Sequence, residues 1–314
     1  MNKYAFHLCA VLLAALVSPK LSAQTTICQA NPVLDQNEQA TGIALDGQRH
    51  AWIAFFAGNF IGEFIQESNG SCVIGQIPIP GSGPNGIAFD GTYLWVSNYY
   101  SNTVSKVSIS SSSVVGTFTV GSGPRGVVFD GTFIWVANYL SNTVTKIQPS
   151  NGAVLGTFAV GSGPYFMAVN TASNTIWVAN RNSNTVTELN QSGGILNTIA
   201  TQSQPQFLAF DGTNMWVSCY SSKTVEEISP SGSILRSVNV SSFGQPTGLT
   251  WDSDDGLIWG VTHSRYLYSI TPSTGGVTGN FFGGSALFDI LYDGTFNRLY
   301  VTDIGNGTVT ELIP

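Results

Sequence analysis

The chain has 314 residues, of which 43% are hydrophobic and only 9% charged, and its formal net charge is −7 at pH 7. An acidic, weakly charged chain lacks the basic surface that binds the phosphate backbone, so nucleic acid is excluded as an expected partner. A chain of this length and hydrophobic content can bury a large core.

The first 23 residues have the features of a secretory signal peptide. Lys3 supplies a positive start, Ala5 to Val17 form an apolar core, and Leu21-Ser22-Ala23 fits a small-residue cleavage site. The apolar core is too short to anchor the protein in a bilayer, and no other long apolar stretch follows it. We therefore expect residues 24–314 to be exported to the bacterial periplasm, cell surface or medium, without a membrane span.

From about residue 40 onward, a unit of roughly forty residues recurs seven times. An aromatic residue marks each copy, at spacings of 39 to 43 residues: Trp52, Trp95, Trp135, Trp177, Trp216, Trp259 and Tyr300. Each copy holds four short runs rich in β-branched and aromatic residues, which in the second copy are Gly86 to Phe89, Leu94 to Asn98, Thr103 to Ser108 and Val114 to Val120. This pattern predicts an all-β protein, a single seven-bladed β-propeller of four-stranded blades with the markers buried between blades.

The ends of the chain suggest how the ring closes. The seventh copy stops after its third strand, Gly307 to Leu312, and the segment Thr25 to Val33 precedes the first copy without a place in it. We expect these two segments to pair, because pairing completes the last blade and removes an open sheet edge.

Three cysteines follow the signal segment. Cys28 and Cys72 are both expected near the start of an outer strand, in adjacent blades, where export permits a disulfide bond. The alternative is that outer strands diverge beyond the Cα separation of about 7 Å that a disulfide tolerates. Cys219 replaces the asparagine found at the same place in other copies and is expected to be a buried free thiol.

Two positions of the repeat fall in loops on one face, around the mouth of the central channel. The first, four residues after each marker, is occupied by Phe56, Tyr99, Tyr139, Arg181, Tyr220, His263 and Ile304. The second, just before the innermost strand, is occupied by Thr41, Asn85, Arg125, Tyr165, Gln206, Thr247 and Phe288. Loops on a rigid scaffold commonly carry function, so these positions are the candidate site.

Aromatic rings with arginine can stack on a sugar or planar ligand, or hold a peptide. The predicted ligand-binding residues are Arg125, Tyr165, Arg181, Tyr99, Tyr139, Tyr220 and Asp303. Alternatively, the tyrosines that follow the markers are repeat residues that pack between blades. Several members depart from the repeat consensus where a seven-fold scaffold does not need them, which favours a site: Arg125, Tyr165, Arg181, His263 and Asp303.

Catalytic candidates are few. His50 lies in a turn on the opposite face and is expected to be solvated, whereas His263 is on the candidate face, where Asp303 or Asp289 could orient it as an acid or base. The alternative is a solvated loop histidine. No cluster with metal-ligand spacing appears, and the segment 252–256 fits a lengthened turn better than a calcium loop, so no metal or cofactor is predicted.

The repeat, with GSGP-x-GIAFDG-x-x-LWV-[SA]-N followed by SNTV-[ST]-K-[VI], resembles the YVTN repeats of bacterial secreted and surface-layer propellers. It is also similar to the streptogramin (virginiamycin B) lyase group, which carries a related GP-x-GI-x-x-DG-x-LW pattern. The lyase resemblance implies magnesium-dependent elimination with His and Glu on the channel face. This chain departs from that pattern, because His263 is the one histidine expected there and the second strands end in Val-Ser-Asn or Val-Ala-Asn.

These observations support three hypotheses. The leading one is an exported, monomeric, non-catalytic propeller that binds a small molecule, glycan or protein partner at its channel face without a cofactor. The second is a lyase-like or lactonase-like enzyme that uses His263 as acid or base. The third is a structural cell-surface protein.

Overall fold

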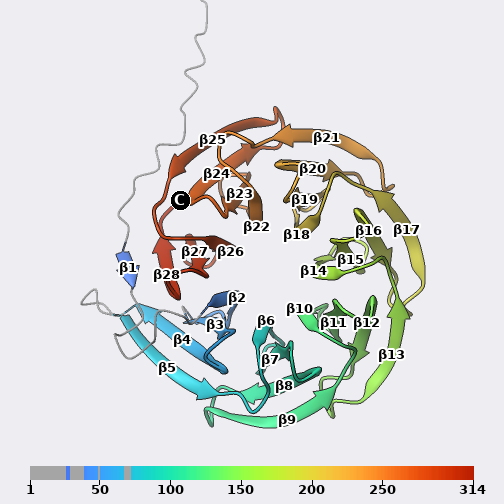
Figure 1. The fold of residues 1–314 in the computed structure, drawn as a ribbon, viewed down its shortest axis with the longest axis vertical. Helices are drawn as coiled ribbons and strands as arrows, with labels where there is room; N and C mark the ends of the chain where they lie inside the picture. The colour runs from blue at the N-terminus through green and yellow to red at the C-terminus, as the bar shows by residue number, and fades with distance from the viewer. Residues whose placement is uncertain (1–25, 29–38, 49, 67–71) are drawn as a thin grey trace, which may run out of the picture.

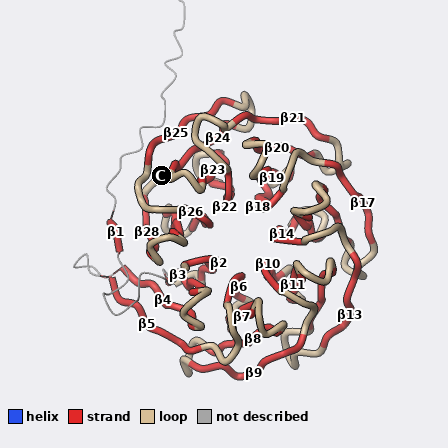
Figure 2. Tube along the Cα trace, viewed as in Figure 1, coloured by secondary structure: helices blue, strands red, loops and turns tan. Residues whose placement is uncertain are grey.

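The computed structural model of the chain describes residues 26–28, 39–48, 50–66 and 72–314. The predicted signal peptide, residues 1–23, lies outside these ranges and stays a prediction. Strands joined by turns and loops make up the described part, as Figure 2 shows by colour. It contains no helix long and apolar enough to cross a membrane.

Seven four-stranded antiparallel sheets surround a central axis (Figure 1), which confirms the predicted seven-bladed β-propeller. Blade 1 contains β2 (Ala40–Leu45), β3 (His50–Phe55), β4 (Phe60–Gln66) and β5 (Cys72–Pro78). Blade 2 contains β6 (Pro84–Phe89), β7 (Tyr93–Asn98), β8 (Thr103–Ser108) and β9 (Ser113–Thr119). Blade 3 contains β10 (Pro124–Phe129), β11 (Ile134–Asn138), β12 (Thr143–Ile147) and β13 (Val154–Ala159). Blade 4 contains β14 (Pro164–Asn170), β15 (Thr175–Asn180), β16 (Thr185–Leu189) and β17 (Ile195–Ala200).

Blade 5 contains β18 (Pro205–Phe210), β19 (Met215–Cys219), β20 (Thr224–Ile228) and β21 (Ile234–Asn239). Blade 6 contains β22 (Pro246–Asp252), β23 (Leu257–Thr262), β24 (Tyr266–Thr271) and β25 (Gly276–Phe281). Blade 7 contains β26 (Leu287–Asp293), β27 (Arg298–Asp303) and β28 (Thr308–Leu312), with β1 (Thr26–Cys28) beside β28. The first strand of each blade lies at the centre and the fourth at the rim (Figure 1).

The marker aromatics form the core between blades, as the sequence predicted. Each is at most 2% exposed, and each packs on the sheet of the next blade. Trp135 of blade 3 contacts a cluster that includes Met167 and Ile176 of blade 4. Tyr300 of blade 7 belongs to a cluster with Ile53 of blade 1, so the same packing joins the last blade to the first.

The Asp-Gly turn that precedes the marker in five of the seven blades has a specific role. In blade 2, Asp90 Oδ1 accepts hydrogen bonds from the backbone N–H groups of Thr92 and Tyr93, while Oδ2 accepts one from the indole Nε1 of Trp95 at 2.8 Å. Gly91 has a φ of 93°, a region in which side chains are strained. The turn therefore fixes the indole that fills the space between blades.

The N-terminal predictions are described only in part. β1 runs antiparallel to β28 with Ile27 opposite Thr310, but the rest of the segment 25–33 lies outside the described residues, so its role in ring closure stays a prediction. The side chains of Cys28 and Cys72 also lie outside the described part, and their disulfide remains untested. Cys219 is a fully buried free thiol, as predicted, and burial raises its pKa.

Candidate functional site

The loops predicted to share one face do meet there. The backbone N–H groups of Tyr99, Tyr139 and Arg181 each donate to a glycine carbonyl of the loop before the first strand of the same blade. Neighbouring blades are also linked, because Asn102 Oδ1 accepts a 2.9 Å hydrogen bond from the N–H of Gly123. These contacts form a continuous rim, here called the mouth, at one end of the channel.

The innermost strands all carry a bulge at the mouth. In blade 2 the register shifts between Pro84 and Ile87, and an equivalent shift occurs in each of the other first strands. A bulge redirects the side chains of its extra residues, and bulges occur often beside functional sites. The second candidate position, which includes Arg125 and Tyr165, lies within these bulges.

Five side chains of blades 2, 3 and 4 converge at the mouth. The guanidinium carbon of Arg125 lies 4.7 Å, 5.0 Å and 4.7 Å from the ring centroids of Tyr99, Tyr139 and Tyr165. The guanidinium carbon of Arg181 lies 5.7 Å from the ring centroid of Tyr165. We call these five residues the arginine–tyrosine cluster. The structure thus brings together five of the seven side chains predicted to bind a ligand.

The two arginines retain hydrogen-bonding capacity. Arg125 Nη1 donates to the Tyr165 hydroxyl at 3.4 Å, and Arg181 Nη2 donates to Gln204 Oε1 at 3.2 Å. The Nε atoms of both arginines are buried and have no partner among the described residues. The ion pairs found in the described part of the chain involve other side chains, so no carboxylate neutralises either guanidinium there.

The arginines change the acidity of the neighbouring hydroxyls. Burial raises the pKa of Tyr139, but hydrogen bonds with Asn182 and Arg181 and the charges of both arginines outweigh burial, so this pKa is lowered. Tyr165 is only 9% exposed, and burial raises its pKa despite the same two charges. The cluster is therefore an electropositive site with aromatic walls.

Gln204, whose side chain accepts a hydrogen bond from Arg181, has a strained backbone conformation. Its φ is 60°, whereas the equivalent loops of blades 2, 3 and 4 use glycine with φ between 64° and 72°. The left-handed region costs a residue with a side chain about 1 kcal/mol or more. Its amide oxygen accepts from Arg181 and also from the hydroxyl of Ser221 at 2.7 Å. The strained backbone of Gln204 in blade 5 thus places an amide oxygen beside the cluster as a hydrogen-bond acceptor.

Three phenylalanines cross the channel below the cluster. Phe166 and Phe207 stack with their ring centroids 4.1 Å apart, and Phe288 from blade 7 lies 6.1 Å and 5.3 Å from them. Sequence reasoning listed Phe288 at the mouth but missed Phe166 and Phe207. The signal was present, because these two occupy a repeat position that holds glycine in four other blades. We call the three rings the phenylalanine plug.

A second space lies along the channel, lined by the first strands of all seven blades. This cavity has a volume of about 380 Å³, and Phe166 and Phe207 form part of its wall. Asp289 is the one ionisable residue among the side chains that line it. Burial raises the pKa of Asp289 to about 7, although the backbone N–H groups of Ile290 and Ile43 partly oppose this shift.

The structure does not form the predicted histidine–carboxylate pair. His263 is exposed at the mouth, with its ring centroid 6.3 Å from that of Tyr220, and no contact with Asp303 or Asp289 is found among the described residues. Asp303 is 3% exposed and accepts hydrogen bonds from the N–H groups of Ser285, Ala286 and Gly305. The expectation that Asp303 has no architectural role was wrong, because its carboxylate organises the last loop of the mouth; its predicted part in ligand binding stays a prediction.

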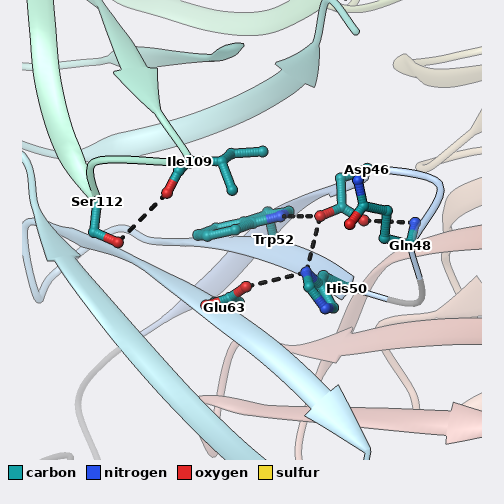
Figure 3. A network of polar contacts seen from close by, with 7 residues as sticks. All are labelled: Asp46, Gln48, His50, Trp52, Glu63, Ile109 and Ser112. Carbon is teal, nitrogen blue, oxygen red and sulfur yellow. Dashed lines mark hydrogen bonds and ion pairs between the residues drawn. The ribbon is translucent and has the colours of Figure 1, made fainter. Parts of the chain in front are cut away.

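His50 differs from its expected solvated state. Its Nδ1 lies 3.0 Å from Asp46 Oδ2 and 3.1 Å from Glu63 Oε1, and Asp46 also accepts from the indole of Trp52 (Figure 3). Glu63 is opposite Trp52 in the sheet, as Glu311 is opposite Tyr300 in blade 7, where it pairs with an arginine. In both blades, a glutamate opposite the marker in the sheet therefore pairs with a basic side chain: Glu63 with His50 in blade 1 and Glu311 with Arg298 in blade 7.

Among the described residues, no group of three or more His, Cys, Asp or Glu side chains is arranged to hold a metal ion. No family model matches the sequence, and no curated protein matches it. The YVTN resemblance therefore stays a prediction.

Solved structures share the fold. A streptogramin B lyase superposes with a TM-score of 0.77 at 15% sequence identity, covering 91% of this chain and 96% of that chain. The virginiamycin B lyase of Staphylococcus aureus gives 0.77 at 15% identity, covering 93% and 100%. Hydrazine synthase of Kuenenia stuttgartiensis also gives 0.77 at 15% identity, covering 91% and 98%. The likeness to streptogramin-lyase-type propellers is one of fold, since such low identities with proteins of different function carry no activity.

Proposed function

We propose that this protein is a ligand-binding β-propeller whose site is the arginine–tyrosine cluster at the channel mouth. One observation carries the proposal: two partly exposed guanidinium groups converge on the ring of Tyr165, and among the described residues no carboxylate pairs with either of them. A guanidinium without a counter-charge at a partly exposed rim can form charge-assisted hydrogen bonds with a ligand.

Binding without chemistry is favoured by the placement of the one histidine of the mouth. A general acid or base requires a reacting group and usually a partner that orients it, and Asp303 is committed to backbone N–H groups. The alternative of a lyase-like or lactonase-like enzyme draws on the fold shared with two lyases and on the exposed position of His263.

The test is a thermal-shift screen of the purified full chain against small metabolites and glycans, followed by calorimetry on the hits. We expect Arg181→Ala and Tyr139→Ala to weaken binding of any genuine ligand by about 1–3 kcal/mol, and His263→Ala to have a smaller effect. Ligands that bind all three variants as they bind the native chain would contradict the proposal. A hit that is consumed, with turnover lost about a hundredfold in His263→Ala, would support the enzyme instead.

We also propose that the protein acts outside the cytoplasm, on the basis of the N-terminal sequence pattern around Lys3 and Ala5 to Val17. Expression in a bacterium, followed by N-terminal sequencing of the exported fraction, should give a mature protein beginning at Gln24. Retention of an uncleaved chain in the cytoplasm would overturn this part of the proposal.

A further inference from the structure

We propose that the arginine–tyrosine cluster binds an organic acid in which a carboxylate is attached to a ring. The carboxylate would be held by Arg125 and Arg181, and the ring would lie against the aromatic side chains of the mouth. This inference rests on the proposed function and names the class of ligand that the site takes.

The charges of the cluster call for an anion. The chain carries a net charge of −7, yet Arg125 and Arg181 lie together at the mouth with no carboxylate paired to either one in the described part. An arginine side chain offers five N–H donors, and among the described residues the one hydrogen bond found from the Arg125 side chain goes to the Tyr165 hydroxyl at 3.4 Å. A negatively charged acceptor would supply the charge-assisted bonds that the protein leaves unmade.

The surroundings of Arg125 favour a planar acceptor. Three tyrosine ring centroids lie within 5.0 Å of its guanidinium carbon, so aromatic groups crowd this arginine. Guanidinium N–H groups lie in one plane, and a carboxylate matches that plane with two parallel hydrogen bonds. A tetrahedral phosphate fits such a crowded position less well. The geometry therefore selects a carboxylate.

The rest of the mouth suits a ring. Tyr99 and Tyr139 are partly exposed, and their ring centroids lie 4.7 Å and 5.0 Å from the guanidinium carbon of Arg125. Aromatic surfaces bind both aromatic rings and the apolar faces of sugars.

The strained backbone of Gln204 is a further observation that points to a role for the Arg181 charge. Its side chain fixes Arg181, and its backbone occupies a conformation for which other blades use glycine. A loop under no functional constraint gains stability by using glycine there. The strain is consistent with a need to hold Arg181 in one orientation.

The experiment is isothermal titration calorimetry on the full chain with paired probes. Benzoate and glucuronate are the two acids, benzyl alcohol and methyl glucoside are their neutral counterparts, and inorganic phosphate is an anion without a ring. The variants are Arg125→Gln, Arg181→Gln and Gln204→Gly. Arg265→Gln is the matched control, since Arg265 is an exposed arginine that follows the same strand end in blade 6.

We expect at least one acid to bind at least tenfold more tightly than its neutral counterpart. Arg125→Gln and Arg181→Gln should each weaken that binding tenfold or more, Gln204→Gly several-fold, and Arg265→Gln less than twofold. Binding of benzoate alone assigns an aromatic acid, and binding of glucuronate alone assigns a sugar acid; either supports the proposal.

Three results would overturn the inference. They are equal affinity for acid and neutral partner, phosphate binding as tight as that of the better acid, and no binding of either acid at millimolar concentration. A neutral compound whose binding is lost in Tyr139→Ala but kept in both arginine variants would overturn the inference while leaving the proposed ligand site standing.

Discussion

The two ends of the channel are built from the same repeats, but the side chains at one end are nearly the same in every blade and those at the other end differ. At the end that carries the Asp-Gly turns, an aspartate accepts a hydrogen bond from the marker indole in five blades. Where Tyr300 replaces tryptophan in blade 7, Asp293 Oδ2 is left without a partner among the described residues. At the mouth, by contrast, consecutive blades present different side chains, among them Arg125 and Arg181 with no carboxylate paired to either in the described part of the chain.

The difference separates residues that hold the ring together from residues that are free to vary. The marker indole and its aspartate hydrogen-bond one another within the blade, as Trp95 and Asp90 do, so a change there costs stability. Positions that depart from the consensus at the mouth contact one another across blades and leave donors open, so a change there should cost binding. The following predictions test this division through the free energy of unfolding, from the largest expected change to the smallest.

Trp135→Ala should lower the free energy of unfolding by about 3–5 kcal/mol, because it leaves a cavity between blades 3 and 4 and removes the partner of Asp130. Urea denaturation monitored by circular dichroism measures the change. Leu140→Ala is the control, since Leu140 is 58% exposed and should matter by less than about 0.5 kcal/mol. A loss below about 1 kcal/mol for Trp135→Ala would contradict the packing described above.

Asp303→Asn should lower the free energy of unfolding by about 1–3 kcal/mol at pH 7, because a carboxylate that accepts several N–H bonds is replaced by an amide. Although burial alone raises the pKa of Asp303, its hydrogen bonds from Ala286 and Ser285 outweigh burial and lower it.

The contribution of Asp303 is therefore present above the unfolded-state pKa of about 3.9 and is lost as the pH falls through the lower folded-state pKa. The difference between variant and native chain should shrink below about pH 4. Asp255→Asn, at an exposed position, is the control. A difference that is independent of pH would show that the charge of Asp303 is not involved.

Asp289→Asn should change how stability depends on pH. The pKa of Asp289 is raised to about 7 in the folded chain, whereas an unfolded aspartate titrates near 3.9. Between these values the folded state binds the extra proton, so this residue makes the native chain less stable as pH rises from about 4 to 7. The variant lacks this pH dependence, so its free energy of unfolding relative to that of the native chain should rise between pH 5 and pH 8, as measured by urea denaturation. Parallel curves would exclude a raised pKa.

Arg181→Ala should change the free energy of unfolding by less than about 0.5 kcal/mol while weakening ligand binding, because its contacts lie at a partly open rim and it forms no ion pair with the described residues. Chemical denaturation and calorimetry on the same sample separate the two effects. A large loss of stability would place Arg181 with the residues that hold the ring together.

The sequence repeat allowed the fold to be predicted. A fixed period with a marker every 39 to 43 residues predicted seven blades, and the strands expected in the second copy agree with β6 to β9 within two residues. The mouth was also accessible, since departures from the consensus at Arg125 and Arg181 stood out against neighbouring copies. Both successes depended on comparing one blade with another.

Other features depended on three-dimensional details that a repeat does not encode. Asp303 departs from the consensus as the arginines do, but the loop before β26 is different and supplies N–H groups that use its carboxylate. The stacking of Phe166 and Phe207 follows from where the bulges direct the side chains. Of the two partners of His50, Asp46 is four residues away in sequence, whereas Glu63 becomes adjacent only through strand pairing, so the whole network could not be assigned from the sequence.

The phenylalanine plug bears on how a ligand can reach the mouth. Rings from blades 4, 5 and 7 lie 4.1 Å to 6.1 Å from one another, so they occupy part of the channel beside Tyr165. We therefore expect a ligand to reach the cluster from the mouth, which suits a small molecule or the end of a polymer better than the middle of a long chain.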